Sequence, residues 1–192
     1  MNMTHAGRCK GSILVHLREY ANTSYGQGAW ADMMGGATPE DRAILGGIVI
    51  AGGWYPVGVW NRALGALLAQ HTVAIDAEMR KVASYIADRD LNSVYKMILR
   101  LGSPEFLLRR TDSLWSRYFD SGRFTHQELG PKKFKLLLEA PHTGDTPDRL
   151  TCGPGVCAWI EMGMKNTGVE GRVQHTSCRF ENKERCEYLA TW

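Results

Sequence analysis

Apolar residues recur at helical spacing through the first two-thirds of the chain. In the segment 57–70, for example, Trp60, Leu64 and Leu67 fall on one face, which is the pattern of an amphipathic helix. Thr38 before Pro39 and Ser103 before Pro104 are typical helix starts, since the hydroxyl can cap the first turn. The segments that we predict as helices are 10–24, 29–34, 38–51, 57–70, 76–88, 92–101 and 104–119.

After residue 122 the pattern changes to that of strands. Phe134, Leu136 and Leu138 alternate with their neighbours at close to period two, so 123–129 and 133–140 are predicted to form a hairpin. A helix over 154–166 and a closing hairpin of 169–180 and 185–191 follow a loop at 141–149. This order predicts an α+β fold, in which N-terminal helices pack on a small antiparallel sheet built from two hairpins with an intervening helix.

Composition fits one domain, 1–192, with a net charge of +3 and basic residues mixed among acidic ones, so no nucleic-acid partner is expected. The most apolar stretch, 43–51, is far short of a membrane span, and residues 1–10 lack the apolar region of a secretory signal. We therefore expect no membrane partner and a cytoplasmic location. Five cysteines, an odd number, argue against a disulfide framework and for metal ligation or burial.

Four cysteines and a histidine gather near the C-terminus. Cys157, Cys178 and Cys186, completed by His175 or Cys152, form a candidate tetrahedral zinc site. Such a closed site would be structural. The alternative is that these are ordinary buried cysteines, because the spacing matches no CxxC zinc knuckle.

The register of the last hairpin decides whether two of these sulfurs meet. A loop of 181–184 would place Arg179 opposite Cys186, whereas a loop of 181–183 would place Cys178 there, with Asn182 in the left-handed region. His175 lies on the opposite face of a regular strand from Cys178, so it can join only through a bulge or a twist.

Val156-Cys157-Ala158-Trp159, followed by Cys178 and Cys186 in a terminal hairpin, resembles the 4-vinyl reductase domain, the sensor module of phenol-responsive transcription activators. The resemblance implies a structural zinc held by Cys157, Cys178 and Cys186. The acidic ligand of that family becomes His175 here, and a shorter helix leaves Cys152 as a rival first ligand.

A second resemblance covers nearly the whole chain. It is to a myxobacterial paralogous family that is related to the 4-vinyl reductase, haem-nitric-oxide-binding and vesicle-tethering trafficking domains. It implies a fold and no activity. The segments that carry it are Lys10-Gly11-Ser12-Ile13-Leu14, Tyr25-Gly26, Trp54-Tyr55-Pro56, Ser103-Pro104-Glu105-Phe106-Leu107-Leu108 and Trp115-Ser116-Arg117-Tyr118-Phe119-Asp120-Ser121-Gly122.

Haem is not expected. The Tyr-x-Ser-x-Arg clamp of the haem-binding relatives is absent, and no histidine lies between His71 and His126 to serve as an axial ligand. An enzyme is not expected either, since the histidines are scattered and no phosphate-binding or dinucleotide-binding motif is present.

The sequence therefore predicts a non-catalytic sensor or regulatory module that binds a small apolar or aromatic molecule. The alternative is a protein-interaction or homodimerisation module with a filled core. The first should have an internal cavity and the second an exposed apolar face. Candidate ligand-binding residues, which could equally fill the core, are Trp54, Tyr55, Trp60, Trp115, Tyr118 and His126.

Overall fold

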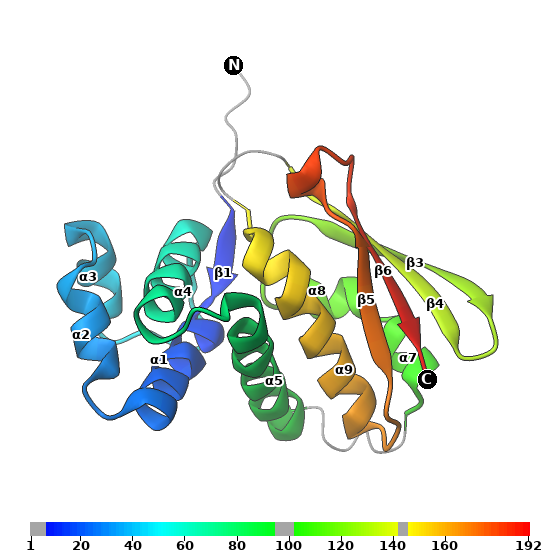
Figure 1. Cartoon of the computed structure of the whole chain (residues 1–192), viewed down its shortest axis with the longest axis horizontal. Coiled ribbons are helices and arrows are strands. Elements are labelled where there is room, and N and C mark those ends of the chain that lie inside the picture. The colour runs from blue at the N-terminus through cyan, green and yellow to red at the C-terminus, as the bar shows by residue number, and fades with distance from the viewer. Residues whose placement is uncertain (1–6, 95–101, 142–145) are drawn as a thin grey trace.

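The computed structural model describes residues 7–94, 102–141 and 146–192, which form a helical part and a sheet part side by side (Figure 1). The helical part includes α1 (Gly11–Tyr25), α4 (Val57–His71) and α5 (Ile75–Val94), and the helix α9 (Val156–Asn166) lies between α5 and the sheet. The shorter helices are α2 (Ala29–Gly35), α3 (Pro39–Leu45), α7 (Pro104–Leu108) and α8 (Thr111–Trp115).

The sheet has four antiparallel strands in the order β3-β4-β6-β5, so its two hairpins meet along β4 and β6. Its strands are β3 (Arg123–Gly130), β4 (Lys133–Glu139), β5 (Arg172–Ser177) and β6 (Cys186–Thr191). In β6 the buried residues alternate, with Cys186, Tyr188 and Ala190 facing the helices. The predicted α+β architecture is confirmed.

Two additional strands were missed at the sequence level. Strand β1 (Arg8–Lys10) pairs antiparallel with β2 (Trp54–Pro56), so that α1 and α4 begin at opposite ends of this short ladder. Three-residue strands have too few positions to show a period of two, so no pattern indicated them.

Several helix boundaries also differ from the prediction. Helix α3 ends at Leu45 instead of continuing to residue 51, because Gly46 and Gly47 follow it. The predicted helix 104–119 is divided into α7 and α8, and 76–88 extends into one longer helix, α5. Most of the predicted helix 92–101 lies outside the described residues. No described helix is long and apolar enough to cross a membrane.

A buried carboxylate joins α1 to α5. Glu78, only 8% exposed, accepts hydrogen bonds from the hydroxyls of Tyr20 (2.5 Å) and Tyr25 (2.7 Å) and pairs with Lys81 (2.8 Å). Burial acts to raise the pKa of Glu78, but the hydrogen bonds from Lys81 and the two tyrosines outweigh it and lower the pKa to about 2. The charged carboxylate therefore stabilises the helical part.

We expect this contribution to disappear in acid. Since the folded pKa lies below the unfolded one, the stabilisation is complete above pH 4.5 and is lost as the pH falls towards 2. In urea denaturation, the loss of unfolding free energy caused by Glu78→Gln should be about 2 kcal/mol smaller at pH 3 than at pH 7. An equal loss at both pH values would contradict this assignment.

Candidate functional site

Three cysteine sulfurs converge between the sheet and the start of α9. Cys152 belongs to η1 (Thr151–Gly155), Cys178 follows β5, and Cys186 begins β6. Their Sγ atoms all lie within 4.8 Å of one another, with Cys152 and Cys186 3.6 Å apart, and all three residues are buried. We refer to them as the cysteine triad.

The local backbone explains why these three meet. The η1 turn is π-helical and contains Pro154, which has no amide hydrogen to donate. A register shift between His175 and Ser177 in β5 marks a bulge, and Asn182 in the turn has a φ of 60°. The left-handed Asn182 that one of the two predicted registers required is therefore present, although Cys178 itself lies just beyond the paired part of β5.

Each thiol of the triad affects the pKa of its neighbours. Interaction with Cys186, together with burial, raises the pKa of Cys152, whereas the hydrogen bond with Cys152 and the nearby His175 lower the pKa of Cys186 despite its burial. Burial also raises the pKa of Cys178. Of the three sulfurs, that of Cys186 therefore ionises most readily to the thiolate, the form that binds metals.

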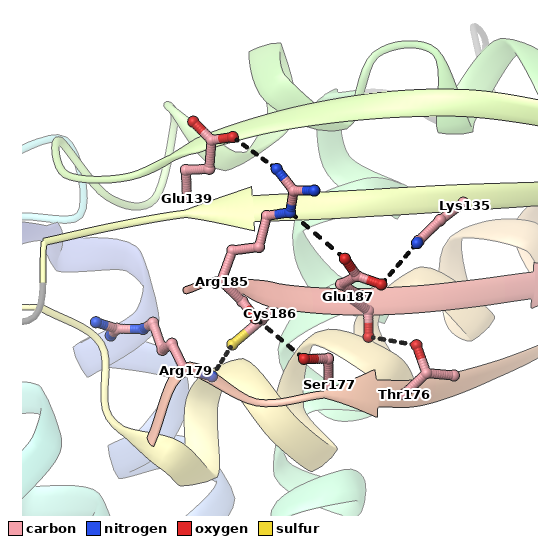
Figure 2. Close-up of polar contacts among 8 residues, drawn as sticks. All are labelled: Lys135, Glu139, Thr176, Ser177, Arg179, Arg185, Cys186 and Glu187. Carbon is pink, nitrogen blue, oxygen red and sulfur yellow. Dashed lines mark hydrogen bonds and ion pairs between the residues drawn. The ribbon is translucent and has the colours of Figure 1, made fainter. Parts of the chain in front are cut away.

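Cys186 and its neighbour Glu187 point to opposite faces of the sheet (Figure 2). On the helix side, the backbone N–H of Arg179 donates to Cys186 Sγ across 3.5 Å. On the other face, Glu187 pairs with Lys135 (2.6 Å) and with Arg185 (3.4 Å). The alternation of faces along β6 thus separates the sulfur from this surface network.

Arg179 is buried beside the triad. Its guanidinium donates to the carbonyl oxygens of Pro141 and Pro147 (both 2.6 Å) and to Thr146 Oγ1 (2.8 Å). Through these hydrogen bonds, Arg179 connects the segment before η1 to the hairpin that carries Cys178 and Cys186. Its positive charge also favours the thiolate form of Cys152.

His175 lies next to the triad without belonging to the 4.8 Å group. Its ring stacks on Tyr188, with centroids 4.8 Å apart, and its Nε2 is buried without a hydrogen-bond partner among the described residues. A buried nitrogen in this state is costly unless a ligand or solvent satisfies it. His175 is therefore the candidate fourth ligand.

Cys157, the first ligand implied by the family resemblance, is not in the triad. Burial raises its pKa to about 11, and Arg80 and the backbone N–H of His175 are its polar neighbours. The rival ligand, Cys152, occupies the place that the resemblance assigned to Cys157.

The geometry suits a tetrahedral thiolate site. Zinc–sulfur bonds of about 2.3 Å imply sulfur–sulfur separations of about 3.8 Å. The 3.6 Å between Cys152 and Cys186 is close to that value, and the whole triad needs only small movements to reach it. Thiolate and imidazole are a donor set that zinc accepts.

A cavity of about 80 Å³ lies between the helical part and α9. Its wall is almost wholly apolar, with contributions from α1, α4, α5, α8, β3, η1 and α9. Of the six predicted ligand-binding residues, Trp60, Trp115 and Tyr118 line it. The wall residues that were not predicted include Met79, Ala83, Phe124, Thr151 and Trp159.

The other three predicted ligand residues do not line this cavity. Trp54 is on the surface with the Lys10 ammonium 4.4 Å from its ring, and the Tyr55 hydroxyl accepts a hydrogen bond from the Ile50 amide. His126 is exposed on β3. Trp54 and His126 are exposed, whereas Tyr55 is half-buried and packs against the hydrophobic core away from the cavity.

Comparison with solved structures relates this arrangement to the H-NOX proteins. The fold matches an H-NOX protein from S. oneidensis in the Fe(II)NO ligation state with a TM-score of 0.74 and 12% identity, covering 94% of this chain and 97% of that one. It matches unliganded Fe(II) H-NOX from K. algicida with a TM-score of 0.73 and 12% identity, covering 95% of both chains. The chain has the H-NOX fold.

A third match, to a structure that probes heme distortion in the H-NOX family, has a TM-score of 0.71 and 10% identity, covering 95% of this chain and 94% of that one. No protein-family model matches the sequence, and no curated protein is similar to it at a significant level. At these identities the likeness is one of fold.

The described cavity does not fit a haem. Its wall contains no histidine, cysteine or basic side chain among the described residues, so only Met79 and Tyr118 carry atoms of the kinds that ligate haem iron. The space of about 80 Å³, which is partly open to solvent, is smaller than the cavity of about 150 Å³ that holds benzene, so a porphyrin could not be enclosed in it.

We expect the triad, and not Cys157, to determine metal affinity. Because even outer partners of a metal ligand affect affinity 10- to 100-fold, Cys152→Ser, Cys178→Ser and Cys186→Ser should each weaken zinc binding by more than about a hundredfold. Competition against a colorimetric chelator measures this. Cys157→Ser, also buried, is the matched control; because serine keeps an acceptor for the backbone N–H of His175, it should weaken affinity by no more than about tenfold. The reverse order of effects for Cys152→Ser and Cys157→Ser would support the family assignment instead.

Proposed function

We propose that this domain is a non-catalytic sensor or regulatory module that takes a small apolar molecule in its cavity and holds a structural zinc ion at the cysteine triad and His175. The observation that carries the proposal is the apolar cavity between α9 and the helical part, in a chain with the H-NOX fold. Its occurrence favours the ligand-binding alternative over a filled core.

The size and lining of the cavity define the class of ligand. An apolar cavity of about 80 Å³ that is partly open to solvent favours a small neutral guest of the class of xenon or benzene, both of which an apolar cavity of about 150 Å³ is known to accept. Trp159 is a wall residue whose Nε1 is buried without a hydrogen-bond partner among the described residues, so it is the donor that we propose for a polar atom of the guest. A small apolar molecule with at most one acceptor fits these features better than a larger aromatic one.

The zinc would have a structural role as a cross-link between two segments of the chain. It would tie η1 to the β5-β6 hairpin and thus fix the N-terminal end of α9 on the sheet. Metal binding of this kind is coupled to folding. The Nε2 of His175, buried without a hydrogen-bond partner in the described part of the chain, supports a site of three sulfurs and one nitrogen.

Xenon tests the cavity directly. We expect xenon to bind the protein as isolated, detected by xenon NMR, and Ala83→Leu to abolish binding because the added carbons fill space that Ala83 borders. Ala87→Leu, one turn further along α5 at a buried position outside the cavity wall, is the matched control and should retain binding. If the protein as isolated bound no xenon, or if both variants bound it equally, the cavity would not be the ligand site.

The alternative function, homodimerisation, is favoured by one observation. The loop between α3 and β2 exposes Ile48 (94%) and Ile50 (66%), and Trp54 at the start of β2 is 36% exposed. Exposed apolar patches of this kind mark interaction sites, and a second copy of the chain is the occupant that we consider.

Native mass spectrometry before and after chelation distinguishes the two functions. For the sensor proposal we expect one zinc per chain, lost with chelator, and no mass of a haem. A dimer that is abolished by Ile48→Ser with Ile50→Ser, and retained in Val73→Ser at another exposed position, would favour the alternative.

A further inference from the structure

The cavity and the cysteine triad share one turn of backbone. In η1, Thr151 and Gly155 line the cavity, while Cys152 between them contributes a sulfur to the triad. The Thr151 hydroxyl also accepts a hydrogen bond from Nε1 of Trp60, another wall residue, across 2.9 Å. A displacement of this turn therefore changes both places.

The glycines of η1 show how closely the turn is confined. A Cβ atom built on Gly155 would lie 2.6 Å from Cε of Met79 in the cavity wall. A Cβ atom on Gly153 would lie 3.6 Å from Nδ1 of His175 beside the triad. The turn thus lies tightly against Met79 on the cavity side and within ordinary contact distance of His175 on the triad side, and its π-helical form is of the type often found at functional positions.

Tyr188 provides a second connection. It is fully buried, and its hydroxyl donates a hydrogen bond of 2.5 Å to the backbone carbonyl of Cys152. Its ring stacks on His175 on the triad side and lies 5.8 Å, between centroids, from Phe124 of the cavity wall. One rigid side chain therefore contacts a wall residue, the fourth-ligand candidate and the backbone of a triad cysteine.

We propose that occupancy of the cavity and metal binding at the triad are energetically coupled through η1 and Tyr188. This inference rests on the proposed function, since it specifies how ligand binding is communicated to the zinc site. Close-packed interiors transmit displacements instead of absorbing them. The guest that fills the cavity presses on Thr151 and Gly155 and thereby changes the position of Cys152 relative to Cys178 and Cys186.

Thermodynamic linkage provides the test. Co²⁺ serves as the metal probe, because its thiolate complexes absorb light, and xenon serves as the cavity probe. We expect saturating xenon to change the Co²⁺ affinity by at least about fivefold, and Co²⁺ to change the xenon affinity by the same factor, as reciprocity requires.

Tyr188→Phe tests the route. It removes only the hydroxyl that reaches the Cys152 carbonyl, and we expect it to reduce the mutual effect of xenon and Co²⁺ while both still bind. The matched control is Tyr20→Phe, which also removes a hydroxyl from a 2.5 Å hydrogen bond but at Glu78 in the α1–α5 contact. In Tyr20→Phe, the mutual effect of xenon and Co²⁺ on each other's affinity should equal that in the unmodified protein. A Tyr188→Phe variant with undiminished coupling would remove Tyr188 from the route.

The outcomes separate this inference from the proposed function. If xenon and Co²⁺ each bind and neither alters the other's affinity, the coupling is refuted while the cavity and the metal site stand. If xenon does not bind, the proposed ligand site is refuted, and the coupling with it.

Discussion

The hydrogen bond from Tyr188 to the Cys152 carbonyl joins the sheet to the turn before α9 at a fully buried point. Tyr188 comes from the centre of β6, and Cys152 comes from the turn that leads into α9. A buried hydroxyl or carbonyl without a partner is costly, so each group constrains the position of the other. This constraint holds α9 against the sheet, and α9 in turn contacts α5.

The two candidate sites lie on either side of that junction. Cavity residues come from the helical part, β3 and α9, while the triad comes from η1 and the β5-β6 hairpin. Each site depends on the same docking of η1 between the layers. The H-NOX fold is retained at 10 to 12% identity in this chain, with a cavity that suits a small guest and does not fit a porphyrin. The same architecture is thus compatible with a different interior.

From the sequence, cysteine and histidine were predicted as the ligands of the candidate metal site, but the choice between Cys152 and Cys157 was left open. Cys152 and Cys157 lie five residues apart, so on a regular helix they would face directions about 140° apart, at 3.6 residues per turn. Which of them faces the hairpin depends on how the helix start is rotated on the sheet, and the π-helical turn alters that rotation. Residue spacing alone could not decide this. Tyr188 could have been found from its alternation with Cys186 in β6, which marks both as facing the interior.

From the sequence alone, periodicity determined the class of the fold, because helices and strands bury their apolar residues at different spacings. The residue type at position 182 also indicated one of the two possible registers of the last hairpin. That register needs a residue in the left-handed region, which asparagine tolerates. Only the tertiary structure decided which aromatic side chains border the cavity. Trp60, Trp115 and Tyr118 do so and Trp54 and Tyr55 do not, because position in the assembled layers, and not residue type, determines what a ring contacts. The tertiary structure also decided which cysteines form the triad, since the three sulfurs come from segments that meet only when α9 and the last hairpin pack together.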